Sequence, residues 1–83
     1  MQRADVLTAL TARAVEVFAV EADAVTENAS FAEDFQVDSL SLVEFTIDLE
    51  EEFGIDLLDD DLGALLTVGS WVDLIHRKVL AKA

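Results

Sequence analysis

Residues 38–54, which read DSLSLVEFTIDLEEEFG, describe one amphipathic helix bounded by a start signal and a stop signal. Asp38 is a favourable N-cap residue, so the helix is predicted to begin at Ser39. Gly54 readily adopts the left-handed conformation that commonly ends a helix. Between these two signals, apolar residues recur every three or four positions, which is the repeat of an α-helix. The segment therefore predicts a helix over residues 39–53.

The apolar side chains of this helix fall into two rows. At about 100° per residue, the row predicted to face the core is Leu42, Phe45, Thr46, Leu49 and Phe53. A second row, predicted to face solvent, is Leu40, Val43 and Ile47, and it runs beside the acidic row Glu44, Asp48 and Glu51. An exposed apolar strip beside carboxylates suggests a docking surface for a basic, partly apolar partner. The alternative is that the strip packs beneath the loop preceding the helix.

Two more long helices are predicted, one on each side of this segment. The first spans residues 3–20, and its apolar face consists of Leu7, Leu10, Ala14, Val17 and Phe18. The last begins near Thr67 or Ser70 and buries Val68, Val72, Ile75 and Val79. A brief helical turn is expected over residues 59–65. With no cysteine, no proline and three glycines, the chain is predicted to form a small all-α four-helix bundle of three main helices and one short helix.

The connection between the first two main helices, residues 21–37, is long for a small domain, so side chains must hold it down. Phe31 and Phe35 are expected to bury their rings against the bundle. Ser30 and Glu33 have the spacing of a capping box, which predicts a short helical turn within the loop. We expect one domain, residues 1–83, and a free-standing protein.

The net charge is −13, from 18 acidic and 5 basic residues. The basic residues lie near the two ends of the chain and are Arg3, Arg13, Arg77, Lys78 and Lys82. Such a surface repels phosphate backbones and anionic membranes, so neither nucleic acid nor membrane is expected as a partner. No apolar run exceeds the four residues 17–20, which predicts a cytoplasmic protein without a membrane span or secretory signal.

Ser39 has no catalytic companions in the sequence. The serine is not part of a Gly-x-Ser-x-Gly turn, and His76 is the only histidine, so a hydrolase nucleophile is not expected. The acidic run 59–61 does not match the spacing of a calcium loop, so no dedicated metal site is expected. Capping by Asp38 explains the local sequence without any further role. A phosphate attached to Ser39 would nevertheless lie at the positive end of the helix dipole.

The motifs described above resemble the acyl carrier proteins of fatty-acid and polyketide synthesis. The matching segments are Asp38-Ser39-Leu40, residues 42–45 and 49–54, residues 28–31 and 33–35, the acidic segment after Gly54, and Thr67-Val68. The resemblance implies a four-helix bundle without catalytic activity. It also implies that Ser39 is esterified to 4′-phosphopantetheine, which a phosphopantetheinyl transferase takes from coenzyme A. The thiol of this arm would hold an acyl chain as a thioester.

The same resemblance implies where partners and cargo bind on a monomeric carrier. The partners would be a ketosynthase, an acyltransferase and other synthase enzymes with basic surfaces. The docking residues would be Asp38, Leu40, Val43, Glu44, Ile47, Asp48 and Glu51. The acyl pocket would be lined by Phe31, Phe45, Leu49, Leu62, Leu65 and Trp71. Trp71 stands where the family commonly has a small residue, so we expect it to fill or reshape this pocket.

Three alternatives remain open: a peptidyl carrier, a D-alanyl carrier, and an unmodified acidic protein-interaction module. Peptidyl carriers usually have Gly-Gly-x-Ser before the modified serine, and D-alanyl carriers are also small and acidic. Asp38-Ser39-Leu40 and the run Glu50–Phe53 favour an acyl carrier over these relatives. Fatty-acid and polyketide synthesis both remain open as the pathway.

Overall fold

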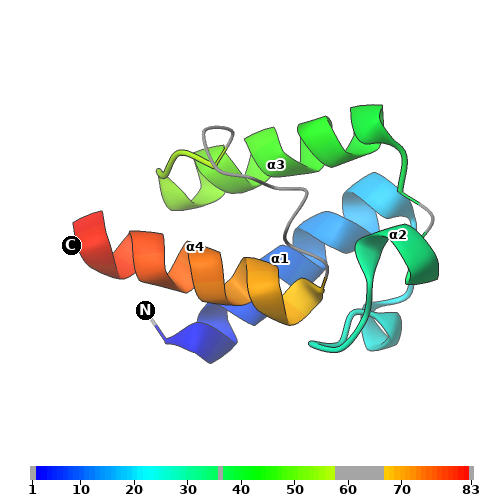
Figure 1. Ribbon diagram of the computed structural model, residues 1–83, viewed down its shortest axis with the longest axis horizontal. Coiled ribbons are helices and arrows are strands. Elements are labelled where there is room, and N and C mark those ends of the chain that lie inside the picture. Colours follow the sequence, from blue (N-terminus) through cyan, green and yellow to red (C-terminus); the bar gives the residue numbers. More distant parts are fainter. Residues whose placement is uncertain (1, 36, 58–66, 83) are drawn as a thin grey trace.

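The computed structural model describes residues 2–35, 37–57 and 67–82, and this part of the chain forms a helical bundle (Figure 1). The helices are α1 (Arg3–Phe18), α2 (Phe31–Asp34), α3 (Ser39–Phe53) and α4 (Val68–Lys82), with a 3-10 turn η1 at Ala22–Ala24. The predicted all-α bundle with three main helices is therefore confirmed. The helical turn predicted over residues 59–65 lies outside the described residues.

Three of the predicted helix boundaries follow from local capping. Gly54 has φ 65° and donates its N–H to the carbonyl oxygen of Glu50 at 2.8 Å, which ends α3 where the sequence predicted. The Ser30 hydroxyl accepts the N–H of Glu33 at 3.3 Å and starts the short helix α2. The hydroxyl of Thr67 accepts the N–H of Ser70 at 3.2 Å, so the first of the two predicted starts of α4 is the observed one.

The predicted end of the first helix, at residue 20, is wrong by two residues. Ala19 adopts the left-handed conformation, with φ 56°, and donates its N–H to the carbonyl oxygen of Val15 at 3.1 Å. A left-handed residue cannot continue an α-helix, so α1 ends at Phe18. Val20 still packs against the core, which is why the apolar pattern extends past the helix.

The core is formed by side chains of α1, α3 and α4, and α1 packs against both of the other helices. The core residues on these three helices are Val6, Leu10, Ala14, Phe45, Leu49, Phe53, Val68, Trp71, Val72, Leu74 and Ile75, and Phe31 of α2 is buried with them. The core row predicted for α3 is confirmed at four positions, including the fully buried Thr46, whereas Leu42 is only partly buried.

The buried face of α1 is rotated relative to the prediction. Val6 is fully buried although the sequence did not single it out, while Leu7, Val17 and Phe18 are only partly buried. On α4, Val79 is also only partly buried, although it was predicted to be buried. The ring of Phe35 is half-buried as well. Several apolar residues fit the helical period on each helix, and the positions of the neighbouring helices decide which of them are covered.

The long loop between α1 and α3 is tied to α4 by backbone and by charge. Val68 donates its N–H to the carbonyl oxygen of Ala29 at 2.9 Å, and Gly69 donates to that of Glu27 at 2.9 Å. The guanidinium of Arg3 contacts the Glu27 carboxylate at 2.5 Å and the Asp73 carboxylate at 2.7 Å. These interactions hold the loop down in addition to the predicted ring of Phe31.

Figure 1 shows how this arrangement places the ends of α3. The N-terminal end of α3 lies beside α2, whereas both chain termini lie toward the left of the view, where α3 ends. None of the helices in residues 2–35, 37–57 and 67–82 is both long and apolar enough to cross a membrane.

Candidate functional site

Ser39 is the first residue of α3, and its side chain is exposed. The preceding Asp38 is the N-cap, because its carboxylate accepts the N–H of Ser41 at 2.8 Å and its carbonyl oxygen accepts the N–H of Leu42 at 3.0 Å. The N–H of Ser41, together with its hydroxyl, lowers the pKa of Asp38 below its usual range. The cap is therefore charged at neutral pH and holds the first turn of α3 in place.

The apolar strip of α3 is exposed, as the sequence predicted. Leu40 is 70 % exposed, Val43 44 % and Ile47 39 %, whereas Phe45 and Leu49 on the core face are fully buried. The alternative, in which this strip packs beneath the preceding loop, is wrong. An exposed apolar strip that begins one residue after Ser39 is a surface that a partner protein can cover.

Carboxylates accompany this strip along α3. Glu44 and Glu51 are exposed, and Asp48 is half-buried. The sequence has no lysine or arginine between residues 14 and 76, so the helix supplies no compensating positive charge. The surface that follows Ser39 is consequently both apolar and negatively charged, which complements a basic partner.

Three of the residues predicted for an acyl pocket meet in the interior. Phe31 is 5 % exposed, Phe45 is fully buried and Trp71 is 1 % exposed. Their ring centroids lie 5.4 Å apart for Phe31–Phe45, 5.4 Å for Phe31–Trp71 and 5.7 Å for Phe45–Trp71. Leu49 is also fully buried, while Leu62 and Leu65 lie outside the described residues.

Phe18 is a member of this aromatic cluster that sequence reasoning missed. Its ring centroid lies 4.9 Å from that of Phe45 and 6.0 Å from that of Phe31. Its position on the apolar face of α1 was recognised, but its neighbours come from α2 and α3. Only the three-dimensional packing of the helices brings these rings together.

Comparison with known proteins agrees with this geometry. A family model described as a phosphopantetheine attachment site matches residues 8–75. The chain is 38% identical to an acyl carrier protein of Thermosynechococcus vestitus over 81 residues, which cover 98% of this chain and 100% of the relative. This chain belongs to the acyl carrier protein family.

A solved structure of the acyl carrier protein from Enterococcus faecalis has the same fold. It superposes with a TM-score of 0.78 and is 37% identical, covering 94% of this chain and 99% of that chain. As a member of the acyl carrier protein family with a phosphopantetheine attachment domain, the protein carries a covalently attached 4′-phosphopantetheine.

The residues around Ser39 fit this group. A phosphodiester needs an accessible hydroxyl, and the side chain of Ser39 is exposed. Within the described ranges, no hydrogen bond occupies the Ser39 hydroxyl. The serine also lies at the N-terminal end of a 15-residue helix, where the dipole favours a negative charge. This member of the acyl carrier protein family thus offers a suitable attachment point at the start of α3.

Proposed function

We propose that this protein carries acyl intermediates as thioesters on a 4′-phosphopantetheine arm attached to Ser39, and presents them to enzymes of fatty-acid or polyketide synthesis. The observation that carries the proposal is the exposed hydroxyl of Ser39 at the capped start of α3, immediately before the exposed strip. The chain itself performs no catalysis. Residues 1–83 act as a single carrier domain and a monomer.

The roles of the residues follow from their positions. Asp38 caps the first turn of α3, which holds Ser39 at the exposed start of this helix. When bound, 4′-phosphopantetheine supplies the thiol that this chain, which has no cysteine, lacks. Ser39 would hold the phosphate near the positive end of the α3 dipole.

The docking surface comprises the strip Leu40, Val43 and Ile47 with the carboxylates of Asp38, Glu44, Asp48 and Glu51. A phosphopantetheinyl transferase, a ketosynthase and an acyltransferase would each place an apolar, basic surface against it. Their basic groups would meet the acidic row, which speeds the encounter, and their apolar groups would cover the strip. We predict that these interactions take place in the cytoplasm.

We further propose that an acyl chain reaches the interior beside Phe31, Phe45, Leu49 and Trp71, with Leu62 and Leu65 completing the pocket. Supporting this, the described members of the set are buried together between α2, α3 and α4. Trp71 occupies much of that space, so the pocket would accept short chains better than long ones.

The attachment is tested by intact-mass measurement after incubation with coenzyme A and a broad-specificity phosphopantetheinyl transferase. We expect the wild-type chain to gain one phosphopantetheine and Ser39→Ala to gain none. Ser41→Ala is the matched control, because it removes another hydroxyl two residues away on the same helix and should still be modified.

An unmodified wild-type chain would contradict the carrier function and favour an acidic protein-interaction module. Modification of Ser39→Ala would place the attachment at another hydroxyl. If the wild type is modified, loading the arm with acyl, aminoacyl or D-alanyl groups by the corresponding enzymes separates an acyl carrier from peptidyl and D-alanyl carriers.

A further inference from the structure

The interior beside the start of α3 is closed by one ring that α2 contributes (Figure 1). Phe31 is the single buried residue of this four-residue helix, and its other three residues are exposed. The ring centroid of Phe31 lies 5.4 Å from that of Phe45 on α3 and 5.4 Å from that of Trp71 on α4. Phe45 and Trp71 belong to 15-residue helices that bury several further side chains. Phe31 is therefore the ring of these three that can be displaced with the least loss of other contacts.

The segment before α2 is joined to the first turn of α4 by backbone hydrogen bonds. Val68 donates its N–H to the carbonyl oxygen of Ala29 at 2.9 Å. The next residue, Gly69, donates to the carbonyl oxygen of Glu27 at 2.9 Å. N–H groups in the first turn of a helix have no acceptor within that helix. We call residues 27–34 the lid, and opening of the lid would transfer these two N–H groups to water.

An ion pair fastens the lid to α1. The guanidinium of Arg3 contacts the carboxylate of Glu27 on the lid at 2.5 Å and that of Asp73 on α4 at 2.7 Å. The three side chains are 36 %, 46 % and 66 % exposed, respectively, so water can replace either contact at little cost. Of the two pairs, the one with Glu27 holds the lid, whereas the one with Asp73 joins α1 to α4 and stays in place when the lid opens.

The short helix α2 is held together by bonds within the lid. Ser30 donates its N–H to the carboxylate of Asp34 at 2.6 Å, and its carbonyl oxygen accepts the N–H of Asp34 at 2.8 Å. The Ser30 hydroxyl accepts the N–H of Glu33 at 3.3 Å. Since none of these bonds reaches another helix, α2 and the ring of Phe31 can move together as one piece.

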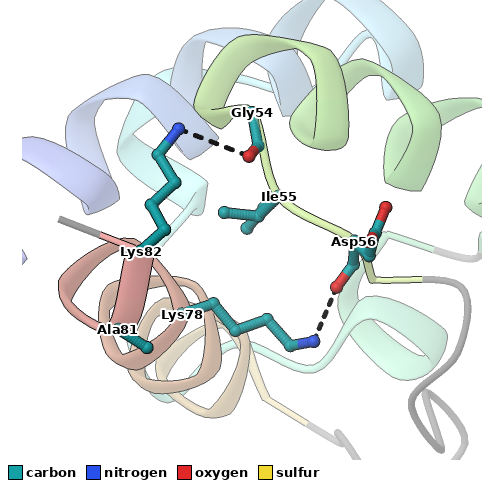
Figure 2. Close-up of a pocket in the computed structure, with 6 residues that line it drawn as sticks. All are labelled: Gly54, Ile55, Asp56, Lys78, Ala81 and Lys82. Carbon is teal, nitrogen blue, oxygen red and sulfur yellow. Dashed lines mark hydrogen bonds between the residues drawn. The ribbon is translucent and has the colours of Figure 1, made fainter.

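The opposite end of the bundle is closed in another way (Figure 2). There, beside a surface hollow, Lys82 of α4 donates to the carbonyl oxygens of Phe53 at 2.7 Å and Gly54 at 3.3 Å. Lys78 donates to the carbonyl oxygen of Asp56 at 2.6 Å. These bonds tie α4 to the end of α3 and to the segment that follows it. Opening at that end would separate two main helices, whereas opening of the lid leaves α1, α3 and α4 packed together.

We propose that residues 27–34 form a lid that opens to admit the acyl chain, with the ion pair between Arg3 and Glu27 as its latch. The structure shows the closed lid, in which the ring of Phe31 occupies the space that the cargo takes when the lid is open. Arg3 and Glu27 are positioning residues, because they act on the cargo only through the lid. This role rests on the function proposed for Ser39, since such a lid serves a carrier that shelters its cargo.

Opening of the lid is measured by native-state amide hydrogen exchange, followed by NMR of the ¹⁵N-labelled full chain with its phosphopantetheine in place. The N–H groups of Val68 and Gly69 are the lid reporters, and that of Leu49, within α3, reports unfolding of the bundle. We expect the lid reporters to exchange faster than Leu49. Their exchange should also depend less on low concentrations of urea, because opening of the lid exposes less surface than global unfolding does.

Glu27→Ala removes the latch and should speed the exchange of the lid reporters about two- to fivefold, as expected for the loss of one exposed ion pair. Glu33→Ala is the matched control, because it removes another exposed carboxylate from the lid, and it should leave the exchange of the lid reporters unchanged. Asp73→Ala is a second control. It keeps the ion pair between Arg3 and Glu27, so it should also leave the exchange of the lid reporters unchanged.

The link to cargo is tested by comparing the chain loaded with a hexanoyl thioester with the unloaded chain. Loading should speed the exchange of the lid reporters but not that of Leu49, because cargo in place of the Phe31 ring keeps the lid open. Phe31→Leu replaces the ring with a smaller side chain and leaves more room for cargo behind the closed lid. Loading of this variant should therefore speed the exchange of the lid reporters less than loading of the wild type does.

Lid reporters that exchange as slowly as Leu49, with the same dependence on urea, would overturn the proposal, and so would equal effects of Glu27→Ala and Glu33→Ala. Unchanged exchange of the lid reporters in a chain that intact mass shows to carry the thioester would also overturn it, but would leave the function proposed for Ser39 intact. A chain that intact mass shows to be unmodified would instead contradict that function, and the role of the lid with it.

Discussion

Asp38 stabilises the helix start that positions Ser39, because its carboxylate accepts the N–H of Ser41 at 2.8 Å. At the scale of single residues, this is the most direct link between sequence and candidate site. A good N-cap is recognisable from its residue type, since it acts on a donor only three positions away. The same reasoning explains why Ser39 lies at the first helical position.

Replacing Asp38 should change stability in a pH-dependent way. Hydrogen bonding from Ser41 lowers the pKa of Asp38, so its stabilising effect is complete above the unfolded pKa of an aspartate, about 3.9. The effect is lost as the pH falls through the lower, folded pKa. Asp38→Asn keeps a neutral cap, so its melting temperature should lie below that of the wild type at pH 7 and approach it in acid.

Thermal unfolding followed by circular dichroism between pH 2 and pH 7 measures this difference. Asp38→Ala, which has no cap, should melt below Asp38→Asn at neutral pH. If the difference in melting temperature between the wild type and Asp38→Asn became larger toward low pH, the stabilising role of the charged Asp38 cap would be contradicted.

Trp71 allows a specific prediction about the length of the acyl chain that the protein can hold. Its side chain is 1 % exposed and contacts the rings of Phe31 and Phe45. Trp71→Ala should destabilise the fold by about 3–5 kcal/mol and leave a cavity. We expect that cavity to protect a long acyl thioester from hydroxylamine better than the wild type does.

Trp71→Leu is a milder truncation and is included in case Trp71→Ala does not fold. The rates at which hydroxylamine cleaves long and short acyl thioesters are compared in the wild type and both variants. Equal protection of the long chain in the wild type and the folded variants would refute the role assigned to Trp71.

At the scale of elements, α1 and α3 both end in a left-handed residue, but only α3 has glycine there. Ala19 has φ 56° and Gly54 has φ 65°. Ala19→Gly should therefore stabilise the protein by about 0.5–1 kcal/mol, because it relieves the cost of a left-handed alanine. Urea unfolding measures this change in the free energy of unfolding.

Gly54→Ala is the reciprocal variant and should act in the opposite direction. It forces an alanine into the left-handed region, and its Cβ would lie 2.6 Å from the Lys82 ammonium, which must move away from the end of α3. A stabilising Gly54→Ala or a destabilising Ala19→Gly would show that helix ends here are set by other forces.

The exposed face of α3 makes a prediction about partners. Leu40 is 70 % exposed at the start of the strip, and Leu80 is 56 % exposed on α4, which gives a matched pair of leucines. Leu40→Ala should lower kcat/KM of a phosphopantetheinyl transferase about five- to tenfold, as expected when a buried interface leucine is truncated.

Leu80→Ala should leave this reaction unchanged, because its side chain lies on another helix. Neither variant should shift the melting temperature appreciably. If Leu40→Ala and Leu80→Ala lowered kcat/KM of the transferase equally, a docking surface on α3 would be contradicted.

At the scale of the whole molecule, Arg3 joins three parts that are distant in sequence. Its guanidinium contacts Glu27 of the loop and Asp73 of α4, and it donates to the carbonyl oxygen of Gly69 at 3.3 Å. The bond from Arg3 lowers the pKa of Glu27, while both carboxylates raise that of Arg3. In a chain of net charge −13, a cation shared by two acids relieves repulsion between them.

Arg3→Gln should therefore lower the melting temperature more than Arg13→Gln, because Arg13 pairs with Glu16 of its own helix α1 and does not join distant segments among the described residues. Because Glu27 has a lowered pKa, the advantage of Arg3 should be complete above about pH 4.3, the ordinary pKa of a glutamate, and should shrink as Glu27 is protonated below it. Thermal unfolding at pH 7 and pH 3 tests this, and equal losses for the two arginines would contradict it.

Much of the candidate site could be predicted because its signals are local. The cap at Asp38, the stop at Gly54 and the exposed row from Leu40 to Ile47 all depend on spacings of a few residues within one helix. The membership of the core was harder to predict, and Val6 and Phe18 show why. Residues at the edge of an apolar stripe are buried or exposed according to where the neighbouring helices lie.

The sequence by itself determined the helices, their polar and apolar faces and the exposed serine, since hydrogen bonds and helical periodicity act over one or two turns. Only the tertiary structure decided which residues distant in sequence meet. It placed Arg3 against Asp73, Phe18 against Phe45, and Lys82 against the carbonyl oxygens that end α3. These contacts depend on how α1, α3 and α4 pack together, which no single helix specifies.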